Sequence, residues 1–321
     1  NFEYQKNNNI IIATENVKFI DELSDVVITS DKAKYFKNLE KIITEGNSKA
    51  ISKDNIITST NFEYQKNNNI IIATENVKVV DLNKETILKT DQLTYLKNEE
   101  KILTLGKTSA LIENKYNFTS KDVTYLKNEF KLSSQEKSLI KDDNGNIYKL
   151  DNFEYSINKK ILKGINLNIL LKNDSNKIDE YFFSEGFFDL DKKNFVSKTT
   201  NVKLHKDIFD NSQNDPRLYG ASSHGDQNQT IVNKGIFTSC KLTDSCPPWS
   251  IKSEKIVHDK INKNLIYKNA LLKVYDVPIL YFPKFFHPDP TVKRRSGFLQ
   301  PQFNNSETLG SSLYIPYFKT L

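Results

Sequence analysis

The sequence NFEYQKNNNIIIATENVK occupies residues 1–18 and recurs without a change at 61–78. Weaker copies lie between and after these two, so the motif returns about every 30 residues over the first part of the chain. The flanks of the exact copies have diverged, to FID at 19–21 and VVD at 79–81, which favours a real duplication. A period of this length predicts a stack of similar units, because one unit cannot bury its apolar face alone.

Within each copy the pattern is that of β-strands. An apolar residue stands two positions before each tyrosine, and a period of two places both side chains on one face of a strand. The segment rich in Lys and Asn that follows suits a tight reversal, because Asn tolerates a left-handed backbone. Apolar residues do not recur with a helical period, and the runs after the turns are β-branched, as in Ile10-Ile11-Ile12. We expect an all-β fold of short strands, stacked as a β-jellyroll or slab of 30-residue repeats.

The same register predicts the interior face of this stack. Its side chains are the tyrosines and the apolar residues before them: Phe2, Tyr4, Ala33, Tyr35, Phe62, Tyr64, Leu93, Tyr95, Val123, Tyr125, Phe153 and Tyr155. Ordinary core packing explains such a ladder, and so does an open apolar trough that binds an acyl chain. Both need the same alternation, so the sequence leaves both open.

The composition argues against several classes of protein. The 321 residues are 37% hydrophobic and contain no apolar run long enough for a transmembrane helix. The net charge of +6 comes almost wholly from lysine, and because arginine is the usual reader of bases and phosphates, we expect no nucleic-acid partner. No paired carboxylates, phosphate loop or nucleophile elbow is present, so we expect no enzyme and no catalytic residues. The four histidines are not grouped as zinc requires, and we expect neither metal nor cofactor.

The periodicity fails between residues 205 and 234. This polar stretch contains proline and glycine, which predicts a long loop or insertion. Just beyond it, Cys240 and Cys246 lie close together among loop residues. Their spacing suits a disulfide in an oxidising compartment.

A long ordered series of motifs follows Gly235. Trp249-Ser250 stands before Ile256-Val257-His258-Asp259, and then come the run from Val277 to Pro283 and the segment Lys293-Arg294-Arg295-Ser296-Gly297-Phe298. This series resembles the segment that joins the periplasmic domain to the barrel in the LptD (formerly OstA) family of lipopolysaccharide-assembly outer-membrane proteins. The 30-residue repeats resemble the β-jellyroll units which that family shares with the periplasmic bridge protein LptA.

The resemblance implies lipopolysaccharide transport and assembly at the cell outer membrane. In the family, the periplasmic jellyroll accepts the lipid from an LptA-like bridge protein and passes it to a laterally opening barrel plugged by an LptE-like lipoprotein. We therefore expect a jellyroll domain at 1–204, a polar insertion at 205–234, the end of the jellyroll with a hinge at 235–290, and the first strands of an incomplete barrel at 291–321. Residues 1–290 would be periplasmic. A free periplasmic LptA-like lipid chaperone and a structural β-solenoid remain as alternatives.

The resemblance also implies a few site residues near the end of the chain. Pro301 and Pro316 match prolines of the family's first barrel strands, and because proline lacks a ladder N–H they imply a lateral gate, unless they simply end strands. Cys240 matches a cysteine bridged to the C-terminal part of the barrel, whereas the nearby Cys246 permits a local bridge instead.

Two local expectations concern the secondary structure of this end. We expect the proline-rich stretch from Pro278 to Pro290 to exclude regular sheet. We also expect a turn at Asn304-Asn305-Ser306 between two strands of barrel length.

Overall fold

The structure is a computed structural model of the chain, and it describes residues 1–23, 25–52, 54–172, 177–206, 215–243, 247–288, 292, 296–298, 302–306 and 310–319. The chain divides into two compact units, Asn1–Val202 and Lys203–Leu321. Among the described residues the elements are strands and short 3-10 turns, which confirms the predicted all-β class. In the described part of the chain no helix has the length and apolarity needed to cross a membrane.

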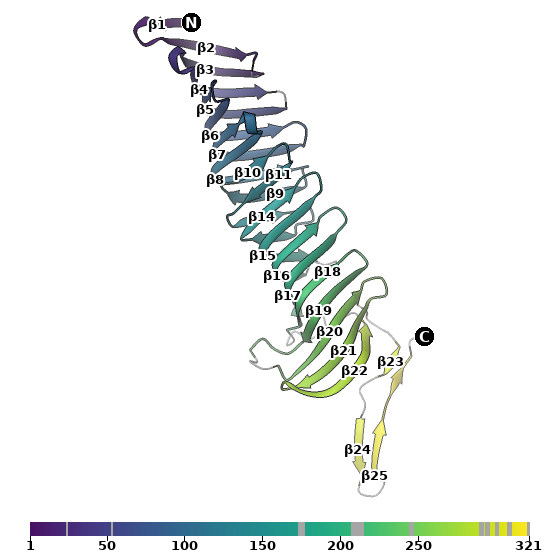
Figure 1. Cartoon of the computed structure of the whole chain (residues 1–321). Coiled ribbons are helices and arrows are strands. Elements are labelled where there is room, and N and C mark those ends of the chain that lie inside the picture. Colours follow the sequence, from purple (N-terminus) through teal and green to yellow (C-terminus); the bar gives the residue numbers. More distant parts are fainter. Residues whose placement is uncertain are drawn as a thin grey trace. The chain divides into compact units, whose positions relative to one another are not determined.

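The first unit is a stack of antiparallel strands (Figure 1). Its strands are β1 (Phe2–Gln5), β2 (Ile10–Asp21), β3 (Val26–Phe36), β4 (Lys41–Ser52), β5 (Asn55–Gln65), β6 (Ile70–Asp81), β7 (Thr86–Leu96), β8 (Lys101–Ile112), β9 (Tyr116–Lys121), β10 (Thr124–Leu126), β11 (Lys131–Ser134), β12 (Ser138–Lys141), β13 (Ile147–Leu150), β14 (Asn152–Ser156), β15 (Ile161–Lys172), β16 (Ile178–Asp189) and β17 (Asn194–Lys203). The 3-10 turns are η1 (Lys6–Asn8), η2 (Lys37–Leu39) and η3 (Lys97–Glu99).

The segments rich in Lys and Asn form the reversals that the sequence predicts. Each 3-10 turn ends on a residue with a left-handed backbone, which is Asn9 after η1 (φ 52°), Glu40 after η2 (φ 43°) and Glu100 after η3 (φ 49°). Asn69 takes the same conformation in the second exact copy (φ 55°). Asn adopts this conformation readily, whereas Glu does so less often.

The strands from β2 to β8 are longer than the short strands expected. Each of them bends near its middle and continues beyond the bend without ending. The register shifts between Thr14 and Val17 of β2, and again near the middle of each following strand up to β7. Left-handed residues such as Glu15, Asn16 and Gly46 lie at these shifts. Extra residues of this kind bend a strand, so one strand contributes to two parts of the sheet.

We call the two parts half A and half B. Half A holds the strand segments on the side of the 3-10 turns, at residues 1–14, 32–45, 61–74, 92–105, 124–134 and 152–165. Half B holds the segments beyond the bend, at residues 17–21, 26–30, 48–52, 55–59, 77–90, 107–121, 138–150, 167–172 and 178–183. Their inner faces touch, as in the ring contacts of Phe19 with Tyr64 (6.4 Å) and of Phe118 with Tyr155 (5.1 Å).

The second unit contains an antiparallel sheet and two short strand pairs. Its strands are β18 (Arg217–Gly225), β19 (Gln229–Thr238), β20 (Trp249–Asp259), β21 (Asn264–Val274), β22 (Val277–Pro288), β23 (Gly297–Phe298), β24 (Gln302–Ser306), β25 (Gly310–Tyr314) and β26 (Tyr317–Phe318). Strands β18 to β22 pair in chain order around a small core that includes Phe237, Ile256 and Tyr267. Strand β23 pairs with β26, and β24 pairs with β25.

Three local expectations differ from this structure. The range 205–234, predicted to be a loop, holds β18 and the first part of β19. Buried positions of this pair include the small polar Ser223, which pairs with Val232, so the sequence shows no regular alternation of apolar residues there. The proline-rich stretch holds β22, which among the described strands pairs on one side only, with β21; proline is tolerated on such an edge. The turn predicted at Asn304-Asn305-Ser306 lies inside β24, where these residues pair with Ser312, Ser311 and Gly310 of β25.

Candidate functional site

The predicted interior ladder lies between the two halves along most of the first unit. Nine of its side chains are buried: Ala33, Phe62, Tyr64, Leu93, Tyr95, Val123, Tyr125, Phe153 and Tyr155. Tyr35 is half-buried and packs against the same core. Phe2 and Tyr4 are exposed by 85% and 47%, so their interior placement was wrong; among the described strands, β1 pairs with β2 alone.

The interior is closely filled and mainly apolar, with buried Ser and Thr hydroxyls such as those of Thr44 and Ser48 at the bend. Aliphatic side chains of half B, such as Ile57 and Leu88, are buried beneath the aromatic ladder of half A. Phe118 of half B contacts Phe153 and Tyr155 of half A, with ring centroids 5.4 and 5.1 Å apart. A guest of lipid size therefore needs the two halves to separate, because side chains already occupy the space between them.

Two buried carboxylates join the halves on the side away from the bend. The hydroxyl of Tyr64 donates to Asp21 (2.9 Å), and the hydroxyl of Tyr125 donates to Asp81 (2.8 Å). Each carboxylate ends a half-B strand and is 2% exposed. We call these two hydrogen bonds the seam bonds. The sequence holds a signal for them, because both aspartates close the diverged flanks that follow the exact repeats, but the predicted ladder names only apolar residues and tyrosines.

Tyr95 occupies the equivalent ladder position between them but has a different partner. Its hydroxyl donates to Glu100 (2.8 Å), and the ammonium of Lys127 bonds to the same carboxylate oxygen (2.9 Å). Lys127 is almost buried, and its ammonium also lies over the Tyr95 ring. Burial and the neighbouring Glu100 raise the pKa of Tyr95, so this tyrosine stays protonated well above its ordinary range.

The last tyrosines of the ladder differ in how their hydroxyls are satisfied. Burial, together with the charge and hydrogen bond of Asp81, raises the pKa of Tyr125. Burial alone is the main cause that raises the pKa of Tyr155. The Tyr155 hydroxyl has no hydrogen-bond partner among the described residues, although it is fully buried. Such a group carries a desolvation cost that nothing offsets.

The remaining predicted residues lie in the second unit or outside the description. Pro316 is half-buried between β25 and β26 and belongs to neither strand, whereas Pro301 and Cys246 lie outside the described residues. Cys240 is half-buried, and its thiol contacts the carbonyl of Trp249 at 3.6 Å. Across the described ranges no group of three or more His, Cys, Asp or Glu side chains could hold a metal ion.

Comparison with known proteins gives a partial match. No family model matches the chain. Over 111 residues it is 38% identical to the LPS-assembly protein LptD of Shewanella oneidensis, a match that covers 32% of this chain and 14% of that protein. The LPS-assembly protein LptD of Escherichia coli strain K12 is 37% identical over 94 residues, or 29% of this chain and 12% of the relative. Over this segment the chain is LptD-like.

The LptD-like segment is a small part of those relatives, since the match spans 14% and 12% of their lengths. Their names describe lipopolysaccharide assembly and not a chemical reaction, in agreement with the prediction that the chain is not an enzyme. Among solved structures, LptH, the LptA-homologous periplasmic component of the lipopolysaccharide transport device of Pseudomonas aeruginosa, aligns with 52% of this chain and 98% of its own, at 6% identity and a TM-score of 0.21.

Proposed function

We propose that the chain is a lipopolysaccharide-transport module of the outer membrane. In this proposal the interior between half A and half B accepts acyl chains, and the lipid then passes towards a laterally opening barrel. The observation that carries the proposal is the mainly apolar interior, a single cluster that includes Ala33 and Leu162, in a chain that is 38% identical to LptD over 111 residues. Burying hydrocarbon yields about 0.8 kcal/mol per CH₂, so several acyl chains would compensate for parting the halves.

The proposal extends to location and partners. Residues 1–290 would lie in the periplasm, where an LptA-like bridge protein delivers the lipid, and the strands after Gly297 would open the barrel, with an LptE-like lipoprotein as its plug. Pro301 and Pro316 would weaken strand pairing at the lateral gate, because proline donates no ladder hydrogen bond. The exposed side chains of Leu313, Tyr314 and Tyr317 support this assignment, since such residues suit a lipid-facing surface.

A structural β-solenoid is the second candidate, and the close packing of the interior favours it. Tyr64 and Tyr155 are fully buried in contact with neighbouring rings, as they would be in an ordinary core. A free periplasmic lipid chaperone would use the same interior but would need none of the strands after Gly297.

Site-specific photo-crosslinking tests the proposal. A benzophenone amino acid replaces Tyr95 or Tyr125, whose rings it mimics in shape, and a matched control carries it at Thr94, which faces outward on the same strand as Tyr95. In cells, the two interior positions should capture lipopolysaccharide and Thr94 should not. Capture at none of the three would favour the structural solenoid. Equal capture at all three would show that the lipid does not enter between the halves.

A further inference from the structure

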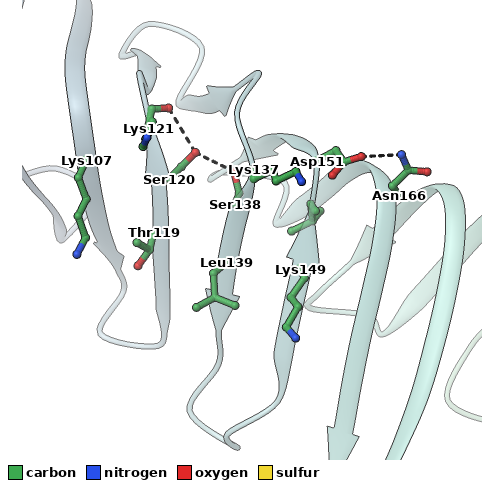
Figure 2. Close-up of a pocket in the computed structure, with 11 residues that line it drawn as sticks. Lys107, Thr119, Ser120, Lys121, Lys137, Ser138, Leu139, Lys149, Asp151 and Asn166 are labelled. Carbon is green, nitrogen blue, oxygen red and sulfur yellow. Dashed lines mark hydrogen bonds between the residues drawn. The ribbon is translucent and has the colours of Figure 1, made fainter.

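The outer surface of half B carries a depression of about 480 Å³ that the proposed function does not use (Figure 2). It lies at the bend, in the part of the unit where strands stop instead of passing through. Strands β9, β12 and β13 belong to half B alone, and their continuations β10, β11 and β14 belong to half A. The interruption leaves the outer surface hollowed.

Four lysines surround this depression, and each comes from a different segment. Lys107 lies on β8, Lys121 ends β9, Lys137 precedes β12, and Lys149 lies on β13. We call this depression the lysine pocket. Figure 2 shows Lys107 and Lys149 on either side of Thr119 and Leu139. Leu139 pairs with Thr119 on one side and with Lys149 on the other, so Thr119 and Leu139 form the floor.

The positive charge of the lysine pocket is compensated only in part, by the single carboxylate of Asp151 among the described lining residues. None of its four ammonium groups forms an ion pair there. The carboxylate that lines the pocket, Asp151, accepts a hydrogen bond from the amide of Asn166 (2.7 Å). Asp122, next to Lys121 in sequence, accepts the backbone N–H of Gly106 (2.8 Å) and does not line the pocket.

Lysines on half A are arranged differently. Lys41 lies 3.6 Å from Glu63 and Lys131 lies 2.9 Å from Glu154, each on the neighbouring strand. In the lysine pocket, Lys107 and Lys121 stand directly opposite one another on β8 and β9. Like charges in that position destabilise a strand pair, and an anion bound between them removes the repulsion.

The chemistry of the lining indicates the kind of anion. The hydroxyls of Ser120 and Ser138 are buried and bond to each other at 2.8 Å, so recognition falls to the ammonium groups. Lysine binds phosphate as a flexible point charge, whereas arginine supplies a planar fork that suits both carboxylate and phosphate. The number of ammonium groups therefore decides the argument, because four of them around one depression suit a compact group with more than one negative charge.

We propose that the lysine pocket binds a phosphate ester. This site goes beyond the proposed function, because the pocket is on the outer side of β9, β12 and β13, while Phe118 and Ile140 of the same strands face the interior. The ester would be either a soluble phosphorylated sugar or a phosphate-bearing lipid headgroup, since both present the same group. Binding at this site does not depend on whether acyl chains enter between the halves.

Calorimetry and vesicle co-sedimentation with the full chain test this site. The soluble probe is glucose 1,6-bisphosphate with glucose as its uncharged control, and the lipid probe is a phosphatidylcholine vesicle with or without phosphatidic acid, both at low ionic strength. The test variant is Lys107→Gln/Lys121→Gln/Lys137→Gln/Lys149→Gln. The matched control is Lys18→Gln/Lys49→Gln/Lys78→Gln/Lys89→Gln, which removes the same charge from the outer surface of half B away from the pocket.

The pocket variant should lose affinity for the phosphate ester by about tenfold or more, and the control variant should change it by less than about threefold. Asp151→Asn should tighten binding. Binding of the sugar bisphosphate alone would assign the site to a soluble ester, and binding of phosphatidic acid vesicles would assign it to a headgroup; either supports the proposal. Equal losses in both quadruple variants, or no preference for either phosphate over its control, would overturn it. All exchanged side chains lie on the surface, and thermal unfolding checks that both variants stay folded.

Discussion

The hydroxyl of Tyr64 donates a 2.9 Å hydrogen bond to Asp21, a carboxylate 43 residues earlier in the chain and on the opposite half of the sheet. One duplication later, Tyr125 bonds to Asp81 at 2.8 Å across 44 residues. These seam bonds lie on the side of the interior away from the bend, and there they join half A to half B, which continuous strands join only at the bend. A buried hydrogen bond to a charged group is stronger than a neutral one, so each seam bond holds half A against half B.

Removing a seam bond should cost more than removing a tyrosine hydroxyl that has no partner. Tyr125→Phe leaves the buried Asp81 with one fewer donor and should lower the free energy of unfolding by about 1–3 kcal/mol. Tyr155→Phe removes a buried hydroxyl without a partner and should leave that free energy unchanged or raise it by about 1 kcal/mol. Urea unfolding of both variants measures the difference. Equal destabilisation would contradict the assigned hydrogen bonds.

Stability should fall at alkaline pH because of the tyrosine ladder. Burial raises the pKa of Tyr95, Tyr125 and Tyr155 in the folded chain, so their contribution is fully present below pH 10 and is lost as pH rises beyond it. In that range each tyrosine reduces stability by about 1.4 kcal/mol per pH unit. The triple Tyr→Phe variant should therefore match the parent's pH dependence in urea unfolding below about pH 9 and show a slope smaller by roughly 4 kcal/mol per unit above about pH 11. A slope unchanged from the parent would mean that these tyrosines ionise freely in the folded state.

The stacking and the interior face follow from sequence periodicity. In each repeat an apolar residue stands two positions before a tyrosine, so both side chains lie on the same face of a strand. The ladder from Phe62 to Tyr155 is buried as predicted. The bend could not be derived in the same way, since its backbone is set by local conformations at residues as different as Glu15, Gly46 and Thr90. A sequence pattern that does not reveal the bend predicts two facing halves and one flat slab equally well.

Two glycines at the bend offer a matched test of its backbone. Gly106 has a φ of +84° and open space where a Cβ would stand, so Gly106→Ala should cost only the left-handed conformation, about 1 kcal/mol. Gly46 has a φ of +76°, and a Cβ there would meet the carboxylate of Asp31 at 2.6 Å. Asp31 also accepts a hydrogen bond from Asn47, so moving it has a further cost.

Gly46→Ala should therefore be the more destabilising change, by about 1 kcal/mol or more, in thermal or urea unfolding. Adding Asp31→Ala should bring the Gly46→Ala variant close to the Gly106→Ala variant, because it removes the clash and leaves only the backbone strain. If Asp31→Ala gives no relief, the Cβ contact is not the cause.

The candidate site was predictable in its apolar part and not in its polar part. Alternation identifies Leu93 or Phe153 as interior, because hydrophobic burial acts on each side chain independently of its distant neighbours. The pairing of Tyr64 with Asp21 depends on how far the bent halves approach each other, and no local pattern encodes that distance. The lysine pocket was missed for the same reason, since Lys107, Lys121, Lys137 and Lys149 have no common spacing in the sequence.

Weakening both seam bonds should make the interior more accessible to apolar guests. Asp21→Asn/Asp81→Asn keeps an acceptor oxygen at each position but removes the charge, which should weaken each bond by about 0.5–1 kcal/mol. Because both changes favour separation of half A from half B, the fraction of molecules in which the two halves are apart should rise about fivefold or more. The binding rate of an apolar fluorescent probe, N-phenyl-1-naphthylamine, reports that population if entry requires separation. Asp31→Asn/Asp91→Asn is the control, because it removes two exposed carboxylates at the bend with the same change in net charge. The control should bind the probe at the parent rate; a seam variant that also does so would show that guests enter without parting the halves at Asp21 and Asp81.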